Sequence, residues 1–334
     1  MVAMVLDWSP LRKLIAECSD ILVLTHMRPD GDAVGSCVAL ALLLQEMGCR
    51  VKIGLDGPCP ANLQFLQPQD LISSISELVV AEASGIVVVD TGTWNQVGTA
   101  APILRTPGRK IVVIDHHRTQ DDLGGDRILD VTAEAAAVLV DRFYAAVERV
   151  PSPDAATALF VGLASDTGWF RHPNCVSTSF EMAARLMQAG ANPSAIHEKL
   201  YSGESLARQR VKGHILSTMK VLADGRVGLF KVLQSDLARM GANAEEALGG
   251  MVDLPRQVAG VRVAVALYEH SDGGTRASLR SDGTVDVATI CATHGGGGHR
   301  PAAGCTLSVS PDRAEEILMA DLVSVLDPDA RVTR

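Results

Sequence analysis

Short apolar segments alternate with longer helical patterns along the first half of the chain. Four runs of Ile, Val and Leu predict strands at 20–26, 50–55, 85–90 and 110–115. The runs are apolar at nearly every position, which is typical of strands that are buried on both faces of a parallel sheet. Helical patterns lie at 33–48, 153–165 and 177–190. The expected fold is therefore α/β, with helices on both faces of the sheet.

The second half begins with a polar, charged helical pattern at about 192–223, which we interpret as a surface helix that connects two domains. Further strands are predicted at 226–233, 261–270 and 275–280. Helices are predicted at 235–250, 284–293 and 311–326, the last with a proline in its first turn. The chain is thus expected to divide into 1–190, a helical linker at 191–223, and a smaller α/β domain at 224–334.

Composition narrows the class of protein. A length of 334 residues exceeds the usual size of one hydrophobic core, so two domains are expected. Hydrophobic residues make up 47% and aromatic residues 4%, which suits an aliphatic interior. The net charge of -9 argues against broad electrostatic binding of duplex DNA or anionic lipid. Any nucleic acid bound here should be short or held at one local patch.

Seven cysteines show no C-x-x-C pair, and an odd number cannot all pair within one chain. Reduced thiols are the simplest interpretation, so we expect a cytoplasmic location and no zinc ribbon. No stretch reaches about 18 uninterrupted apolar residues, so no membrane span is expected.

Polar side chains follow three of the predicted strands at the carboxyl end. They are His26, Asp30, Asp32, Asp90, Asp115, His116 and His117. The segment "LASDTGWF" adds Asp166 at the end of another element. Because the carboxyl ends of parallel strands converge on one edge of a sheet, we expect these groups to lie together.

A single aspartate at a strand end is most often a turn or helix cap, but the ordered recurrence of such clusters favours one site. So many acids repel one another unless a cation is present. Mixed carboxylate and imidazole ligands suit Mn²⁺, Fe²⁺ or Zn²⁺ better than Mg²⁺. The number of ligands fits two divalent ions better than one.

A run of four glycines in "HGGGGHRPAAG" at 294–304 could let the backbone approach an anion. It matches neither the P-loop nor the dinucleotide-binding pattern, and by itself a glycine run is usually a flexible turn. Nearby polar residues favour a pocket for a terminal phosphate. Its expected members are Arg280, Ser281, Gly296, Gly297, Gly298 and His299. A terminal phosphate held there would restrict the site geometrically to very short substrates.

The segments "HMRPDGDAVGS", "VVVDTG", "VIDHH" and "LASDTGWF" resemble, in this order, the four motifs of the DHH phosphoesterase family. "SLRSDG" and the glycine run resemble its DHH-associated domain. The resemblance covers nearly the whole chain and is strongest to the bacterial oligoribonucleases and 3′-phosphoadenosine-5′-phosphate (pAp) phosphatases. It implies a catalytic, metal-binding DHH domain at 1–190, a helical linker, and a substrate-binding DHH-associated domain at 224–334, with the active site in the cleft between them.

The resemblance also implies roles for individual residues. His26 and Asp30 would bind one ion, Asp90 would bridge, and the second ion would be bound by Asp32, His116 and Asp166. Asp115 would orient the cluster, either from behind the ligands or as an alternate ligand. His117 would face the substrate phosphate, and His117 and Asp115 are the expected catalytic residues. The implied cofactor is a pair of divalent ions, with Mn²⁺ favoured, and the implied assembly is a homodimer.

The expected activity is cleavage of dinucleotides such as pApA and pGpG to 5′-mononucleotides, with dephosphorylation of pAp as a second reaction. Two alternatives stay open, namely a cyclic dinucleotide phosphodiesterase and a catalytically idle nucleotide-binding regulator. The sequence does not rank the substrates, and it assigns no role to Thr132 or Arg300.

Overall fold

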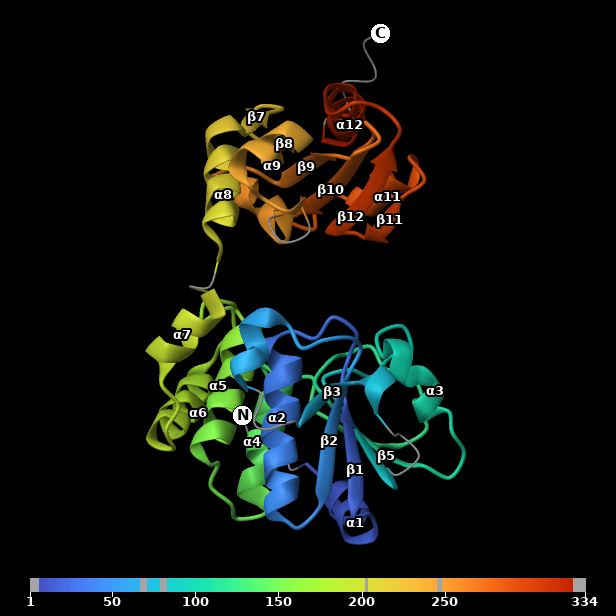
Figure 1. Ribbon diagram of the computed structural model, residues 1–334, viewed down its shortest axis with the longest axis vertical. Coiled ribbons are helices and arrows are strands. Elements are labelled where there is room, and N and C mark those ends of the chain that lie inside the picture. Colours follow the sequence, from blue (N-terminus) through green and yellow to red (C-terminus); the bar gives the residue numbers. More distant parts are fainter. Residues whose placement is uncertain (1–5, 67–70, 79–82, 202–203, 245–247, 327–334) are drawn as a thin grey trace. The chain divides into compact units, whose positions relative to one another are not determined.

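The computed structural model describes residues 6–66, 71–78, 83–201, 204–244 and 248–326. The chain divides into two compact units, residues 1–203 and residues 204–334. Each unit is built on one six-stranded sheet, and the strands and helices of each are labelled in Figure 1.

The first unit contains a fully parallel sheet with the strand order β3-β2-β1-β4-β5-β6. The strands are β1 (Asp20–Leu24), β2 (Arg50–Leu55), β3 (Ile72–Ser74), β4 (Gly85–Val89), β5 (Lys110–Asp115) and β6 (Asp126–Leu129). The chain moves outward from β1 to β3 and then returns to the other side of β1 at β4. Such a reversal leaves a crevice at the carboxyl ends of the two central strands, where open α/β sheets bind ligands.

Both faces of this sheet are buried because successive residues of each strand enter different cores. On β1, Val23 belongs to one core and Leu24 to the other. The first core includes α1 (Ser9–Glu17), α2 (Gly31–Glu46), η1 (Ala61–Leu66), α4 (Ala136–Ala146), α5 (Pro153–Asp166), α6 (Ser177–Gln188) and α7 (Pro193–Tyr201). The second core includes the short helices η2 (Ile75–Glu77), η4 (Gly98–Ala100) and α3 (Ala101–Leu104).

Glycines let α2 and α5 approach each other very closely. A Cβ atom added at Gly35 would lie 2.3 Å from the carbonyl oxygen of Ala158, and one added at Gly31 would lie 1.9 Å from Oγ of Ser165. Larger residues at these positions would force the helices apart. The close packing brings the end of α5, with Asp166, next to the start of α2.

The second unit contains a mixed sheet with the order β11-β12-β10-β9-β8-β7, in which only β8 and β9 pair in parallel. Its strands are β7 (Lys220–Leu222), β8 (Val227–Val232), β9 (Val263–Glu269), β10 (Thr275–Ser281), β11 (Gly297–His299) and β12 (Ala302–Leu307). One face packs against α11 (Val287–Ala292) and α12 (Pro311–Leu326). The other packs against α8 (Leu206–Thr218), α9 (Gln234–Met240) and η5 (Met251–Gln257).

The α/β class and the parallel sheet of the first unit are confirmed, and the second unit is also α/β, with a six-stranded sheet of its own. The segment expected as one linker helix instead forms two helices that belong to different units. Ile196 and Leu200 of α7 lie in the core of the first unit, whereas Val211 and Ile215 of α8 lie in the second. The helix expected at 235–250 is interrupted, because α9 ends where Gly241 adopts a left-handed φ of 65°, and positions 245–247 of that expected helix lie outside the described residues. Within the described residues, no helix has both the length and the apolarity needed to span a bilayer.

We expect Gly35→Ala to lower the free energy of unfolding by about 1–3 kcal/mol, because the new methyl group meets backbone that cannot move aside. Urea unfolding would measure the loss. Gly213→Ala in α8 is the matched control, since a Cβ atom there meets nothing within 4 Å and should stabilise the helix by up to about 1 kcal/mol. Equal stability of Gly35→Ala and the wild type would contradict the close packing of α2 on α5.

Candidate active site

The polar residues predicted from the strand ends come together at the carboxyl edge of the parallel sheet. Three groups of possible metal ligands have donor atoms within 4.8 Å of one another. They are His26, Asp30 and Asp90; Asp32, His116 and Asp166; and Asp90, His116 and His117. Asp90 belongs to two of these groups and His116 to two, so the groups form one continuous cluster.

Asp90 lies at the centre of the cluster. Its Oδ2 is 3.5 Å from Nε2 of His26, and its Oδ1 is 3.3 Å from Nε2 of His116. The residue follows the last position of β4, has a left-handed φ of 63°, and donates its N–H to the carbonyl oxygen of Ile114. A left-handed conformation is costly for a residue other than glycine, and such strain is concentrated at functional sites. Asp90 is also only 2% exposed.

Backbone carbonyls fix the protonation of the two imidazoles beside Asp90. Nδ1 of His26 lies 3.0 Å from the carbonyl oxygen of Met27, and Nδ1 of His116 lies 3.1 Å from that of Ala133. A carbonyl oxygen can only accept, so each Nδ1 carries the proton of the neutral ring. Each Nε2 is left with a lone pair directed at the carboxylates, which is the arrangement that orients histidine ligands in metal sites.

The charges within the cluster are unbalanced. Burial lowers the pKa of an imidazole, but the attraction of Asp90 outweighs it at His26 and raises this pKa to about 9. At His116 the attraction of Asp166 and Asp90 outweighs burial, and the pKa rises to about 11. Burial, together with the charges of Asp90 and Asp166, raises the pKa of Asp32 well above its ordinary value. The cluster therefore favours any bound positive charge.

A divalent ion fits these residues. Oδ1 of Asp90 and Nε2 of His116 are buried and have no hydrogen-bond partner within the described part of the chain. Buried polar atoms are rarely left without a partner, and here both atoms are possible metal ligands. The residues able to hold ions are His26, Asp30 and Asp90 on one side, and Asp32, His116 and Asp166 on the other.

Asp32 also stabilises the fold around the site. It is fully buried, and its two carboxylate oxygens accept hydrogen bonds from the backbone N–H groups of Ala136 and Ala137 and from the hydroxyl of Ser36. The N-cap residue of α4, Ala135, has no side chain able to accept these bonds. A carboxylate from α2 therefore caps α4 across the fold.

Asp115 and His117 lie beside the cluster. Nδ1 of His117 is 2.8 Å from Oδ1 of Asp115 and 3.7 Å from Oδ1 of Asp90. Asp115 is buried, while the side chain of His117 is about half exposed. The hydrogen bond to Asp115 occupies Nδ1, so Nε2 is the nitrogen of His117 that can face a substrate.

The predicted phosphate-binding residues lie in the second unit. Arg280 and Ser281 end β10, and the hydroxyl of Ser281 is buried and donates to the carbonyl oxygen of Val285. Within the glycine run, Gly297 and Gly298 enter the exposed edge strand β11, while Gly295 lies in the turn before it. Gly298 has a φ of 144°, and a Cβ atom there would lie 2.5 Å from the carbonyl oxygen of Ala302.

The two residues without an assigned role make local contacts. Arg300 donates from Nε to the carbonyl oxygen of Gly283, and Thr132 donates from its hydroxyl to Asp130. These hydrogen bonds give both side chains a partner within the protein, so no ligand is needed to explain their positions.

Sequence reasoning missed residues that support the cluster from a distance. Nδ2 of Asn174 donates to the carbonyl oxygens of both Glu134 and Asp166, and so joins the end of α5 to the segment before α4. Gln120 donates from Nε2 to Asp115. Neither side chain lies in an apolar pattern or at a strand end, so only the folded contacts reveal them.

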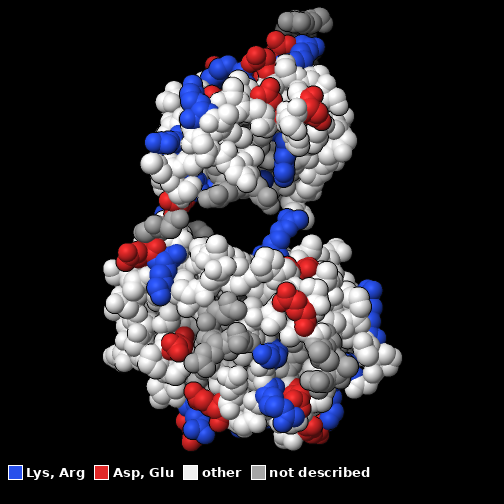
Figure 2. Space-filling model, viewed as in Figure 1, with Lys and Arg blue, Asp and Glu red and all other residues white. Residues whose placement is uncertain are grey.

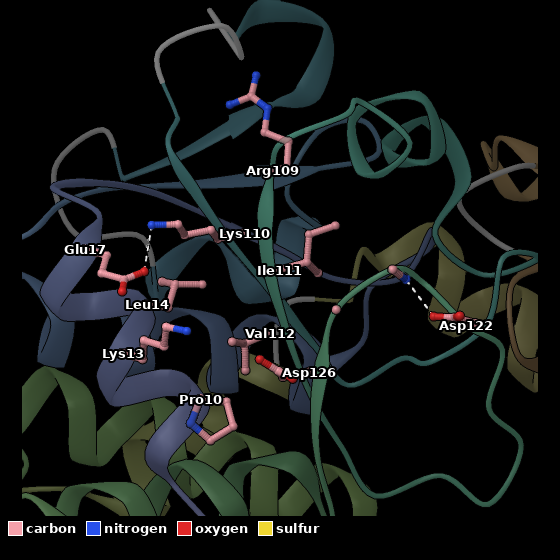
Figure 3. Close-up of a pocket in the computed structure, with 12 residues that line it drawn as sticks. Pro10, Lys13, Leu14, Glu17, Arg109, Lys110, Ile111, Val112, Asp122 and Asp126 are labelled. Carbon is pink, nitrogen blue, oxygen red and sulfur yellow. Dashed lines mark hydrogen bonds and ion pairs between the residues drawn. The ribbon is translucent and has the colours of Figure 1, made fainter.

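Other surface features do not compete with this site. A cavity of about 510 Å³ lies between α1 and the amino-terminal ends of β5 and β6, at the opposite edge of the sheet (Figure 3). Its lining mixes cations such as Lys13 with acids, and Lys110 is paired with Glu17 at 2.7 Å. On the face shown in Figure 2, basic and acidic side chains are interspersed. The cavity has no convergent set of unpaired chemical groups among the described residues.

Known proteins share both domains. A model of the DHH family, N-terminal domain, matches residues 20–163, and a model of the DHHA1 domain matches residues 231–323. The bifunctional oligoribonuclease and PAP phosphatase NrnA of Thermus thermophilus is 30% identical, covering 90% of this chain and 89% of that protein. The protein of the same name from Bacillus subtilis is 28% identical, covering 93% and 96%. A solved exopolyphosphatase-related protein from Bacteroides fragilis has a TM-score of 0.86 at 22% identity, covering 98% and 99%.

We expect Asp32→Ala to destabilise the metal-free protein by about 1–3 kcal/mol, because three hydrogen-bond donors would lose their acceptor. Asp166→Ala is the matched control, since its carboxylate is partly exposed and meets His116 but, within the described residues, accepts no backbone N–H group. Denaturant unfolding in the presence of a chelator measures both. Similar stabilities of the two variants would contradict the capping role of Asp32.

Proposed function

The chain belongs to the DHH family, and we propose that it is a metal-dependent phosphohydrolase that cleaves very short oligonucleotides to 5′-mononucleotides and also dephosphorylates pAp. The position of Asp90 carries this proposal, because one buried carboxylate joins two sets of ligand atoms. The relatives named bifunctional oligoribonuclease and PAP phosphatase support the choice of substrates, since they match nearly the full length of the chain.

In this proposal two divalent ions share Asp90. His26 and Asp30 would complete one ligand set. Asp32, His116 and Asp166 would complete the other. Mn²⁺ is favoured, because it accepts carboxylate and imidazole ligands together. The ions would supply Lewis-acid stabilisation of the phosphoryl oxygens and lower the pKa of the attacking water.

Of the two remaining residues of the rim, His117 would act on the substrate directly and Asp115 indirectly. His117 is about half exposed and has its Nδ1 bonded to Asp115, so its Nε2 can contact a phosphoryl or leaving oxygen. The attraction of Asp115 raises the pKa of His117, and this favours a protonated ring that stabilises negative charge. Asp115 would act by holding the ring and not by contact with the substrate.

The second unit would bind the terminal phosphate of the substrate. Arg280 would provide positive charge, and the edge strand β11 would present N–H groups on the side opposite its partner β12. The members of this proposed pocket are Arg280, Ser281, Gly296, Gly297, Gly298 and His299. Ser281 would act mainly by supporting the turn after β10, because its hydroxyl already bonds to Val285. Assembly as a homodimer and exclusion of long duplex DNA stay predictions.

Asp90→Asn should reduce Mn²⁺-dependent hydrolysis of pApA and pAp by at least about 100-fold, because the shared ligand for both ions would be weakened. Initial rates after chelation and re-addition of Mn²⁺ measure the effect. Asp154→Asn, an exposed substitution in the first turn of α5, should leave the rate unchanged. A wild-type protein that turns over neither substrate with Mn²⁺ would refute the proposed function.

Arg280→Ala should raise the KM for pApA roughly 10- to 100-fold, because a charge-assisted hydrogen bond to the terminal phosphate would be lost. The KM for ApA, which has no terminal phosphate, should stay close to that of the wild type. A cyclic dinucleotide provides a second comparison that also lacks this group. An equal loss on all three substrates would argue against a terminal-phosphate pocket at Arg280.

A further inference from the structure

The carboxylate of Asp115 is fully occupied by protein donors. It is 1% exposed, and its Oδ1 accepts from the backbone N–H groups of His116 and His117 and from Nδ1 of His117. Its Oδ2 accepts from Nε2 of Gln120 at 2.5 Å. Asp115 is therefore a rigid connection between Gln120 and the ring of His117.

The amide of Gln120 has only one favourable orientation. Its Nε2 donates to Oδ2 of Asp115 and also, at 3.0 Å, to the carbonyl oxygen of His117. Rotating the amide by 180° would place Oε1 against two acceptors, which is repulsive. Gln120 therefore holds His117 in two ways. It donates directly to the backbone carbonyl oxygen of His117, and through Asp115 it holds the His117 ring.

The loop that carries Gln120 is attached to the loop that follows β4. Asp121 donates its N–H to the carbonyl oxygen of Gly92 at 2.7 Å, and its Oδ2 accepts the N–H of Trp94 at 2.8 Å. The indole Nε1 of Trp94 donates to the carbonyl oxygen of Asp122 at 3.1 Å. These hydrogen bonds between the two loops therefore fix the position of Gln120 relative to the segment that begins with Asp90.

Gly92 provides the space that the Gln120 amide occupies. A Cβ atom at Gly92 would lie 1.9 Å from Oε1 of Gln120 and 2.5 Å from its Nε2. Gly92 does not have a left-handed φ, so its backbone can accept alanine, and the overlap with the amide is the obstacle. Oε1 is buried without a hydrogen-bond partner in the described part of the chain. A buried oxygen without a partner is costly, and this cost accompanies the orientation in which Nε2 of Gln120 donates to Asp115.

We infer that Gln120 is a positioning residue for the reaction. It holds Asp115, and through Asp115 it fixes both the orientation of the His117 ring and the proton on Nδ1, so that Nε2 faces the substrate. The inference rests on the proposed function and adds to it a residue that does not touch the substrate. Buried groups that orient a catalytic imidazole typically change the rate of the chemical step more than substrate binding.

Kinetics of Gln120→Ala and Gly92→Ala test this inference, because the first removes the amide and the second displaces it. Each should lower kcat for pApA roughly 10- to 100-fold and leave KM within about twofold. The double variant should be no slower than the slower single variant, because both changes break the same contact. Gln120→Glu should also be slow, since it places a carboxylate against Asp115. Gln188→Ala on the exposed end of α6 and Gly213→Ala are controls that should retain the wild-type rate.

The proton on Nδ1 of His117 gives a readout that does not depend on hydrolysis. In metal-free protein, the hydrogen bond to Asp115 should give a downfield imidazole proton resonance that is missing in His117→Gln. The resonance should move upfield or broaden in Gln120→Ala and in Gly92→Ala. Thermal unfolding of each variant shows whether it is folded, and the two variants reach the same contact by different changes.

Wild-type kcat and an unchanged resonance in both variants would overturn the inference. So would losses that multiply in the double variant, because the two residues would then act separately. If the resonance responds as expected but the wild type hydrolyses neither pApA nor pAp, the positioning of His117 stands and the proposed function fails.

Discussion

Repulsion among buried carboxylates is the constraint on which the rest of the first unit depends. Asp32 and Asp90 are almost completely buried, and they share one sheet edge with Asp30 and Asp166. The fold offsets part of this repulsion with N–H groups at helix starts. Asp30 caps α2, and Asp32 accepts from the first turn of α4. The remaining repulsion is offset by protons on the imidazoles or by bound cations. The crowding of carboxylates that destabilises the metal-free protein therefore also favours the binding of a metal ion.

The packing of α2 on α5 shows how backbone chemistry determines the position of the acids. Gly31 and Gly35 allow two helices to meet without intervening side chains, and a Cβ atom at Gly162 on α5 would lie 2.7 Å from Oδ1 of Asp32. These glycines are therefore as necessary to the cluster as its ligands. They keep Asp166, from a remote part of the chain, within reach of residues that follow β1.

The sequence was sufficient for the four central strands of the parallel sheet and for its polar edge, because apolar strands and strand-end acids are local signals. It did not predict the short outer strands β3 and β6. It was insufficient where tertiary contacts decide. The pattern at 192–223 predicts one polar helix, yet Ile196 is buried in a core of the first unit and Ile215 in a core of the second. Two glycines of the run, Gly297 and Gly298, form part of β11 because they pair with β12, a partner that the run itself does not reveal. Gln120 is visible only once two loops lie together.

Asp115, His116 and His117 show how adjacent residues can acquire different chemistry. Both imidazoles are anchored through Nδ1, but His116 is anchored by a neutral carbonyl and His117 by a carboxylate. Nε2 of His116 lies 3.3 Å from both Asp90 and Asp166, so it becomes available to a cation once its proton is lost. A charged anchor raises the pKa of His117 and favours a ring that carries positive charge. The two rings therefore differ in their surroundings: Nε2 of His116 lies among the acids of the cluster, whereas the ring of His117 is about half exposed and is held by Asp115.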